Sequence, residues 1–457
     1  MGVMEERKYG IKMTEGSPVR ILLRFALPLF LGNLLQQCYN LADLSIAGHL
    51  LGDRALSQIG ATSALCSLIT NASFGLNQGL ALSVSRSFGA GDRRKVKESV
   101  CWMAVLSGLS AFALAAGFLL SRRSLLLALQ VPQGLWEGAL GYFTIILAGV
   151  PLTMAYNLET SLLQAVGDSK TPLLFLFCSS VLNIFLDFLF LGPLGLGVQG
   201  AAAATVLAQG ASAGMGMAYL WRSFPQLRFG AKELKAPKSF VIKMYWDGLS
   251  MALMGTVYNI GSVLLQGSIN GLGNVYIAAQ VGGRRLAELF QIPGLALGTG
   301  MATFSSQNYG AGEGVRIKKG IWAASFLYGV WWLAAVAFVS LAAPQAVRAV
   351  TGSGNGEVVA NAVLYLKIST WMAPPMAVLV IVRNVLQGMR HTISPLLCST
   401  LELAGKAVFA FSLVPAWGYG AVCICEPVTW VVCFFFILGA AFMHREELKD
   451  YVKEGAG

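Results

Sequence analysis

The 457-residue chain is 56% hydrophobic and only 12% charged, whereas soluble domains are about 25% charged. This composition excludes an ordinary soluble domain and indicates a protein that crosses a membrane many times. The net charge of +11 does not indicate a nucleic-acid surface, because the basic residues lie in short joints between apolar runs instead of along one face.

In chain order, the apolar runs predict an all-α integral membrane fold with twelve transmembrane helices in two six-helix bundles. Each run is long enough to cross about 30 Å of hydrocarbon at a rise of about 1.5 Å per residue. The predicted spans are residues 20–47, 54–84, 95–120, 135–165, 171–191, 198–221, 240–268, 275–307, 316–343, 358–388, 394–415 and 418–443.

The joints between these spans alternate between basic and nearly uncharged. Because basic joints face the cytoplasm, we expect both termini to be cytoplasmic in a multi-pass protein of the cell (inner or plasma) membrane. The amino terminus has no signal-peptide pattern with a cleavage site, so the first span should remain. The longest polar interval, residues 222–239, is predicted to be a cytoplasmic linker between an N-terminal lobe (1–221) and a C-terminal lobe (240–457).

The two predicted lobes share a repeated sequence. The joint SFGAGDRRKVK recurs as NYGAGEGVRIKK, and the matching Gly89 and Gly310 are 310 − 89 = 221 positions apart. Three further pairs are each separated by 223 positions: Pro151 and Pro374, Gln164 and Gln387, and Pro172 and Pro395. Since each half has an even number of spans, the repeats have the same orientation, which is a plan of secondary transporters.

Charged residues within the spans are the candidate functional residues, because charge in hydrocarbon is costly and is by default functional. Asp43 lies deep in the first span, and Asn183 and Asp187 lie one helical turn apart in the fifth. Carboxylate, amide and hydroxyl oxygens that converge in a dry site bind either a proton or a hard cation such as Na⁺. The alternative is that the first helix ends near Leu41 and Asp43 lies in water at its tip.

The two repeats, the doubled GAG joint and the motifs YNLAD, NIFLD and GAAAAT resemble the multidrug and toxic compound extrusion (MATE) family over nearly the whole chain. The acid pattern is similar to the DinF-like branch, which implies a proton or cation site at Asp43, Asn183, Asp187 and Thr205, with Na⁺ at Asp43 and Asp187 as one option. The resemblance implies a V-shaped helical fold that exports amphipathic or cationic small molecules, such as drugs and toxins, in exchange for H⁺ or Na⁺. The NorM-like branch is disfavoured, because this chain has no acids deep in its seventh and tenth spans.

The first span contains further candidate residues. Gln36, Tyr39 and Asn40 are the candidates for the substrate cavity. Pro28 is the candidate helix hinge, because proline has no N–H and weakens the helix one turn earlier.

The carboxyl half has its own charged cluster: Arg284, Glu288, Glu402, Lys406 and Glu426. By the repeat offset, Lys406 matches Asn183 (406 − 183 = 223) and Glu426 matches Thr205 (426 − 205 = 221). The cluster is either a second coupling site or, as we favour, a neutralised structural pair, since buried charge is tolerated chiefly when paired. We therefore predict Lys406 within about 4 Å of Glu402 or Glu426.

Three functions remain open: a cation-coupled exporter, a lipid-linked oligosaccharide flippase of the same superfamily, and a membrane-embedded enzyme. The flippase would need a basic cavity, for which Arg284 and Arg285 are the only hint. An enzyme would need a nucleophile and base or a metal motif, and the sequence shows neither. His49, His391 and His444 lie in joints or at a helix end and are interpreted as solvated or capping residues. We expect no cofactor besides the coupling ion, no other metal and no nucleic-acid partner, and a monomer in the lipid bilayer that binds a small-molecule substrate.

Overall fold

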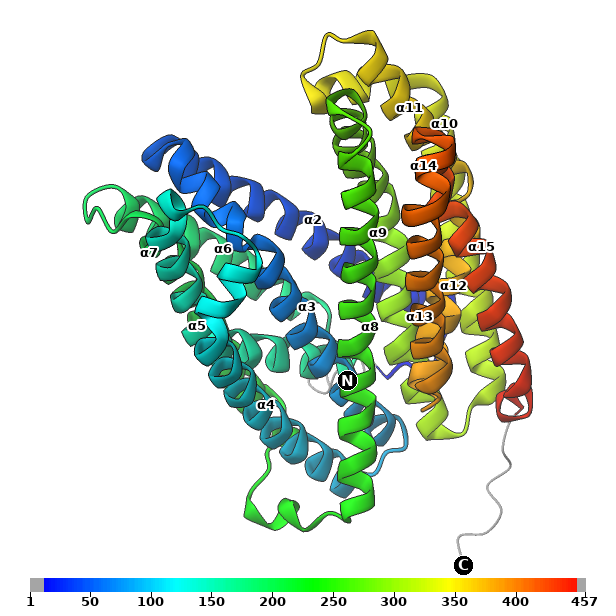
Figure 1. Ribbon diagram of the computed structural model, residues 1–457. Helices are drawn as coiled ribbons and strands as arrows, with labels where there is room; N and C mark the ends of the chain where they lie inside the picture. Colours follow the sequence, from blue (N-terminus) through cyan, green and yellow to red (C-terminus); the bar gives the residue numbers. More distant parts are fainter. Residues whose placement is uncertain (1–11, 450–457) are drawn as a thin grey trace, which may run out of the picture. The chain divides into compact units, whose positions relative to one another are not determined.

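The computed structural model describes residues 12–449, and this part of the chain is helical, with no strand among the described residues (Figure 1). In hydrocarbon, a helix satisfies its backbone N–H and C=O groups within one segment, which is why long apolar runs become helices. The predicted all-α class is confirmed. The predicted cytoplasmic position of the termini concerns residues 1–11 and 450–457, which lie outside the described residues.

The contacts divide the chain into two compact units. Among the described residues, unit 1 contains Lys12 and Leu31–Ala252, and unit 2 contains Met13–Phe30 and the described part of Leu253–Gly457. Both boundaries fall inside a helix instead of a loop: α2 (Pro18–Leu51) and α8 (Lys238–Asn270) each belong partly to both units. The lobe limits of 1–221 and 240–457 stay a prediction.

Five long helices lie wholly in unit 1, with three short 3-10 helices between or after them. They are α3 (Asp53–Gly89), α4 (Arg93–Ala128), η2 (Gln133–Leu135), α5 (Trp136–Ala165), α6 (Lys170–Leu191), α7 (Gly197–Ser223), η3 (Pro225–Leu227) and η4 (Ala231–Lys235).

Unit 2 repeats this order, with two of its spans interrupted. Its elements are α9 (Asn274–Ala311), α10 (Gly314–Thr351), α11 (Gly356–Trp371), α12 (Ala373–Gly388), α13 (Ile393–Val408), the π-helical turn η5 (Phe409–Leu413), α14 (Val414–Trp417), α15 (Tyr419–Met443) and the 3-10 helix η6 (Arg445–Leu448). Residues 358–388, predicted as one span, form α11 and α12, which meet at a bend of 50°.

Nine described helices, or ten spans if the bent pair is counted as one, are long and apolar enough to cross a membrane. Helices α7 and α9, which are 27 and 38 residues long, are not among these ten spans. With them, the part of the chain between residues 12 and 449 has twelve long helical segments. Large apolar side chains such as Leu120 and Leu341 are more than 80% exposed. Apolar outer surfaces of this kind fit a lipid environment.

The packing within each unit follows the predicted repeat. In unit 1, α5 packs against α3, α4 and α7, and α6 packs against α7. In unit 2, α11 and α12 pack against α9 and α10, α12 packs against α15, and α13 packs against α15. The paired prolines differ in effect, because Pro151 lies inside the unbroken α5 whereas Pro374 lies in the first turn of α12, next to the 50° bend.

The first part of α8 belongs to unit 1 because it packs closely against α3. A Cβ atom at Gly79 would lie only 2.3 Å from the Asp247 carbonyl oxygen, so this crossing needs glycine. Beside it, Arg86 of α3 forms a buried ion pair with Asp247 of α8. Arg86 follows the predicted span 54–84 and was therefore expected in an exposed joint, but it is buried within α3.

Candidate functional site

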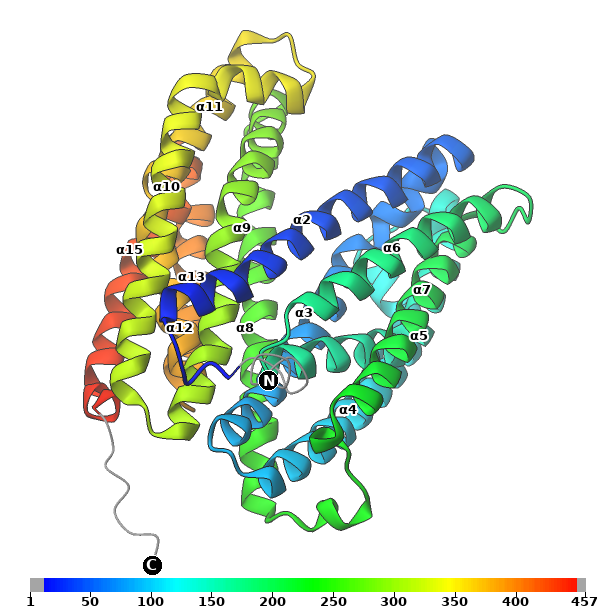
Figure 2. The same ribbon diagram turned by 180° about the vertical axis from the view of Figure 1, so that it is seen from behind.

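The structure brings the two predicted acids of unit 1 together. Asp43 comes from the later part of α2 and Asp187 from α6, which lie side by side in this unit (Figure 2). Their carboxyl groups lie close enough to interact electrostatically. Asp187 is fully buried, whereas Asp43 is half-buried. Two carboxyl groups this close can both be ionised only with a cation between them. Without a cation, they share a proton.

Asn183 and Thr205 complete the polar side of this site. With the Asn183 amide nitrogen turned toward Asp187, it donates to Asp187 Oδ2 at 3.0 Å, and the amide oxygen accepts from the Thr205 backbone N–H at 3.2 Å. This orientation is assigned from the hydrogen-bond network. Tyr39 interacts electrostatically with both Asp43 and Asp187. Five side chains from α2, α6 and α7 thus surround one polar centre.

One oxygen of each acid is left without a partner. Oδ1 of Asp43 and Oδ1 of Asp187 are buried, and neither has a hydrogen-bond partner among the described residues. A buried acceptor without a partner is costly, and a buried ionised carboxylate without a partner costs more. The donor set of carboxylate, amide and hydroxyl oxygens suits a proton or a hard cation.

Helix α2 continues well past Asp43, so the alternative in which it ends near Leu41 is wrong. The helix ends at Leu51. Its last turns are held by apolar packing, because Ala47 is fully buried in a cluster with Ala55 of α3 and Val198 of α7. Asp43 therefore lies two turns inside a packed helix.

The candidate cavity and hinge residues also lie on α2. Gln36 Nε2 donates to Asn40 Oδ1 at 3.2 Å on an exposed part of the helix, and Tyr39 points toward the acids. Pro28 lies inside α2, two residues before the boundary at which the helix passes from unit 2 to unit 1. The substrate and hinge roles of these residues stay predictions.

Sequence analysis missed a tyrosine that neighbours the acids and a further buried acid of unit 1. Tyr142 of α5 interacts electrostatically with both Asp43 and Asp187. Glu159 of α5 is fully buried against Gly216 of α7, and neither of its carboxyl oxygens has a hydrogen-bond partner among the described residues. The signal for Glu159 was present, since it is an acid within the apolar run 135–165.

In unit 2, the predicted contacts of Lys406 are confirmed. Lys406 Nζ lies 3.2 Å from Glu402 Oε1 and 4.0 Å from Glu426 Oε1, and the lysine side chain is 1% exposed. Arg383 adds a second cation, with Nη1 4.0 Å from Glu402 Oε2. Two acids and two bases make the cluster neutral. Arg383 was missed, although an arginine within VLVIVRNVL is conspicuous.

Aromatic side chains enclose this charged group. The Lys406 ammonium lies 4.0 Å from the centre of the Tyr258 ring, a cation–π contact, and the Tyr365 hydroxyl donates to Glu426 Oε2 at 3.1 Å. Arg284 forms its own ion pair with Glu288, one turn along α9, at 2.8 Å. The geometry agrees with the structural pair that the sequence favoured, and Arg284 is neutralised locally.

The chain has two helical repeats with apolar outer surfaces. One repeat contains a polar acid site, and the other contains a cluster of charged residues with no net charge. These features are typical of a polytopic membrane protein of the secondary-transporter type. The family model described as MatE matches residues 28–189 and 201–411. The chain therefore belongs to the MatE family of membrane transporters and is not an enzyme.

Known relatives agree with this family. The chain is similar to the "Probable multidrug resistance protein YpnP" of Bacillus subtilis (strain 168), with 29% identity over 66% of this chain and 68% of the relative. It is also similar to the "FAD transporter" of Shewanella oneidensis, with 24% identity over 66% and 68% of the two chains. The solved structure described as "Crystal structure of MATE in complex with MaL6" shares the fold, with a TM-score of 0.88 and 21% identity over 96% and 99% of the two chains.

Proposed function

We propose that the protein is a cation-coupled antiporter that exports amphipathic or cationic small molecules. In this proposal, Asp43, Asn183, Asp187 and Thr205 bind the coupling ion, which is H⁺ or Na⁺. The similarity to proteins named for multidrug resistance supports the export of such compounds. The acid pattern of the DinF-like branch supports the choice of coupling residues.

The observation that carries the proposal is the paired acid site of unit 1. Asp43 and Asp187 face each other, and Oδ1 of each is buried without a partner among the described residues. Such a site needs a proton or a cation to be stable, and an ion that enters from one side and leaves to the other supplies the driving force. The cluster of unit 2 has no such need, because Lys406 and Arg383 already balance its two acids.

The test is efflux of a fluorescent organic cation from proteoliposomes with an imposed pH or Na⁺ gradient. Asp43→Asn and Asp187→Asn each keep the shape of the side chain and remove its charge, so either change should abolish gradient-driven efflux while expression and dye binding persist. Glu137→Gln removes an exposed acid in the first turn of α5 and serves as the matched control, with efflux as in the wild type. Wild-type efflux in both aspartate variants would move coupling away from this site.

The same vesicles distinguish the substrate class. Because one relative is named as an FAD transporter, FAD serves as the anionic comparison. A lipid-linked oligosaccharide flippase would need a basic cavity. Arg284 is paired with Glu288, which leaves the exposed Arg285 as the remaining hint. We expect gradient-driven transport of the organic cation in preference to FAD, and the reverse order would replace the cationic substrate class by an anionic one.

A further inference from the structure

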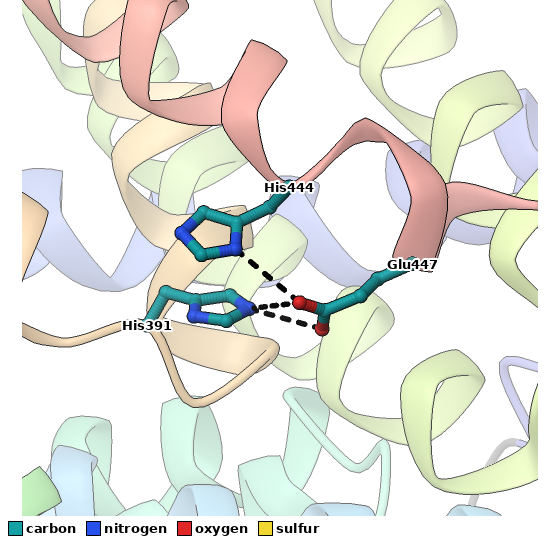
Figure 3. Close-up of side chains that lie close together, drawn as sticks. All are labelled: His391, His444 and Glu447. Atoms are coloured by element: carbon teal, nitrogen blue, oxygen red, sulfur yellow. Dashed lines mark hydrogen bonds and ion pairs between the residues drawn. The ribbon is translucent and has the colours of Figure 1, made fainter.

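Three metal-ligating side chains meet in unit 2, and none of them belongs to the acid site of unit 1. His391 follows α12, His444 caps the end of α15, and Glu447 lies on η6 (Figure 3). His391 Nε2 lies 3.0 Å from the Glu447 carboxylate, and His444 Nδ1 lies 3.2 Å from Glu447 Oε1. The imidazole rings are stacked, with centroids 3.5 Å apart and planes 22° apart. Both rings therefore present a nitrogen to one point.

The repeat shows that this cluster is a departure from the plan of the fold. At the offset of 223 positions, Asp168 of unit 1 matches His391 (391 − 168 = 223). Asp168 lies just before α6, and its carboxylate accepts hydrogen bonds from the backbone N–H groups of Lys170 and Thr171 in the first turn. His391 replaces this helix cap by a side chain that turns to Glu447 instead.

The backbone before His391 is held in an unusual conformation. Gly167 of unit 1 has φ 89°, and the residue that matches it in unit 2 is Arg390, with φ 73°. A non-glycine residue in the left-handed region is strained and persists where the surroundings fix it. The turn is closed by the His391 N–H, which donates to the Leu386 carbonyl at 2.8 Å. This turn fixes the position of the His391 ring.

The second half of the cluster has changed in the same way. At the offset of 220 positions, His444 matches Phe224 (444 − 224 = 220) and Glu447 matches Leu227 (447 − 227 = 220). Both unit 1 residues are buried in its apolar core. In unit 1, these two positions hold the end of α7 by apolar contact. In unit 2, the same positions have two metal-ligating side chains.

The carboxylate of this cluster is oriented by contacts on both of its oxygens. His391 Nε2 lies 3.0 Å from Glu447 Oε2, and His444 Nδ1 lies 3.2 Å from Glu447 Oε1. The Tyr309 hydroxyl of α9 donates to Glu447 Oε2 at 3.1 Å. Such an outer partner is typical of a metal ligand, because it fixes the direction of the carboxylate.

We propose that His391, His444 and Glu447 bind a divalent transition-metal ion, with Zn²⁺ the best fit, and that the ion ties the α12–α13 joint to the end of α15. In a tetrahedral zinc site, neighbouring ligand atoms lie roughly 3.3 Å apart, close to the 3.0 and 3.2 Å between Glu447 and the two imidazoles. The three ligand atoms all lie within 4.8 Å of one another. Two imidazoles and one carboxylate favour zinc over Mg²⁺ or Ca²⁺, which prefer oxygen ligands alone.

Sequence analysis expected no metal here because the ligands are far apart in the chain. His391 and Glu447 are 56 positions apart, outside the spacing of a zinc motif. Only the pair His444 and Glu447, three positions apart, lies on one helical turn. The histidines were therefore interpreted as capping or solvated residues.

The test measures Zn²⁺ binding to the full chain, purified in detergent with an affinity tag that contains no histidine and stripped with a chelator. We expect about one Zn²⁺ per chain in the wild type. His391→Asn, His444→Asn and Glu447→Gln should each weaken binding by more than about tenfold, and Tyr309→Phe by less, since it only orients the carboxylate. His49→Asn is the matched control, because His49 is the one other histidine of the chain, and it should bind as the wild type does.

A spectroscopic arm decides the result even if a ligand variant fails to fold. Co²⁺ bound by the wild type in a four-coordinate site should give strong visible absorption, and Zn²⁺ should remove that absorption. Absence of the absorption, or zinc binding that none of the three ligand variants weakens, would reduce the cluster to an ion pair only.

Discussion

Units 1 and 2 share one helical plan but treat buried acids in opposite ways. Asn183 of unit 1 matches Lys406 of unit 2, and Thr205 matches Glu426. In unit 1, Asp43 and Asp187 each keep a buried oxygen without a partner among the described residues. In unit 2, Glu402 lies within 4.0 Å of both Lys406 and Arg383. Neutral partners in one repeat have become charged partners in the other.

In the proposed mechanism, this difference separates coupling in unit 1 from stability in unit 2. The ammonium group of Lys406 is covalently part of the chain, so the acids of unit 2 keep a counter-charge without a bound ion. The acid site of unit 1 has neutral neighbours, and in the proposed mechanism an ion from outside balances its charge. A site can drive transport only if its occupancy changes during the cycle.

The largest expected effect comes from removing the fixed cation of unit 2. Lys406→Met leaves Glu402 and Glu426 buried with Arg383 as the remaining cation, and breaking a buried pair from one side destabilises by about 3–5 kcal/mol. Thermal unfolding of the detergent-purified protein should show a large loss of melting temperature. Lys367→Met, which removes an exposed lysine of α11, is the control. Equal melting temperatures for the two variants would contradict the structural role of Lys406.

Neutralising one acid in each unit should have unequal effects on stability. Glu402→Gln weakens the pairing of the buried Lys406 and the half-buried Arg383 and should destabilise by roughly 1–3 kcal/mol. Glu159→Gln of unit 1 replaces a buried acid whose carboxyl oxygens have no partner among the described residues, so stability should stay equal or rise. Melting temperatures of the two variants measure the contrast. A larger loss from Glu159→Gln would mean that this acid has a partner after all.

The repeated GAG joint gives a smaller contrast. Asp92 caps α4, since its Oδ1 accepts from the Arg94 and Lys95 backbone N–H groups at 3.1 and 3.0 Å, whereas the side chain of Glu313 makes no cap hydrogen bond to α10. Asp92→Ala should therefore destabilise by about 1 kcal/mol, and Glu313→Ala by less. Chemical unfolding of the two variants tests this difference.

The Asp92 cap also predicts a pH dependence. The hydrogen bond from the Lys95 backbone N–H, against partial burial, holds the pKa of Asp92 below its ordinary value. The cap's contribution is thus fully present above the unfolded pKa, about 3.9, and is lost as the pH falls through the lower folded value. The stability difference between wild type and Asp92→Ala should be constant at neutral pH and shrink under strong acid. A difference that is unchanged in acid would contradict the cap.

The helices shared by the units differ as well, since α2 contains Pro28 and α8 contains no proline. Pro28→Ala restores a helix hydrogen bond and stiffens α2 near the unit boundary. We expect slower dye efflux with less effect on dye affinity. Pro344→Ala in α10 is the matched control. Unchanged turnover in Pro28→Ala would remove the hinge from the mechanism.

The helical fold and the buried charged residues could be predicted from the sequence, because one physical cause dominates each of them. Long apolar runs can only be helices in lipid, and Asp43 and Lys406 were conspicuous because charge in such runs is rare. Contacts between residues that are distant in the sequence could not be predicted. The Arg86–Asp247 pair and the meeting of His391 with Glu447 arise from helix packing, which no spacing encodes.

The most direct test of the account is the affinity of the wild-type protein for a fluorescent organic cation, measured as the pH is lowered and, separately, as Na⁺ is raised. If the ion and the substrate compete through Asp43 and Asp187, the affinity for the organic cation falls as the pH is lowered, as Na⁺ is raised, or in both cases. The size of the fall is set by the difference in substrate affinity between the two ion states of the protein. Asp187→Asn should flatten the dependence, while Glu137→Gln should leave it intact. Affinity in the wild type that stays constant across pH and Na⁺ would contradict competitive coupling at the acid site of unit 1.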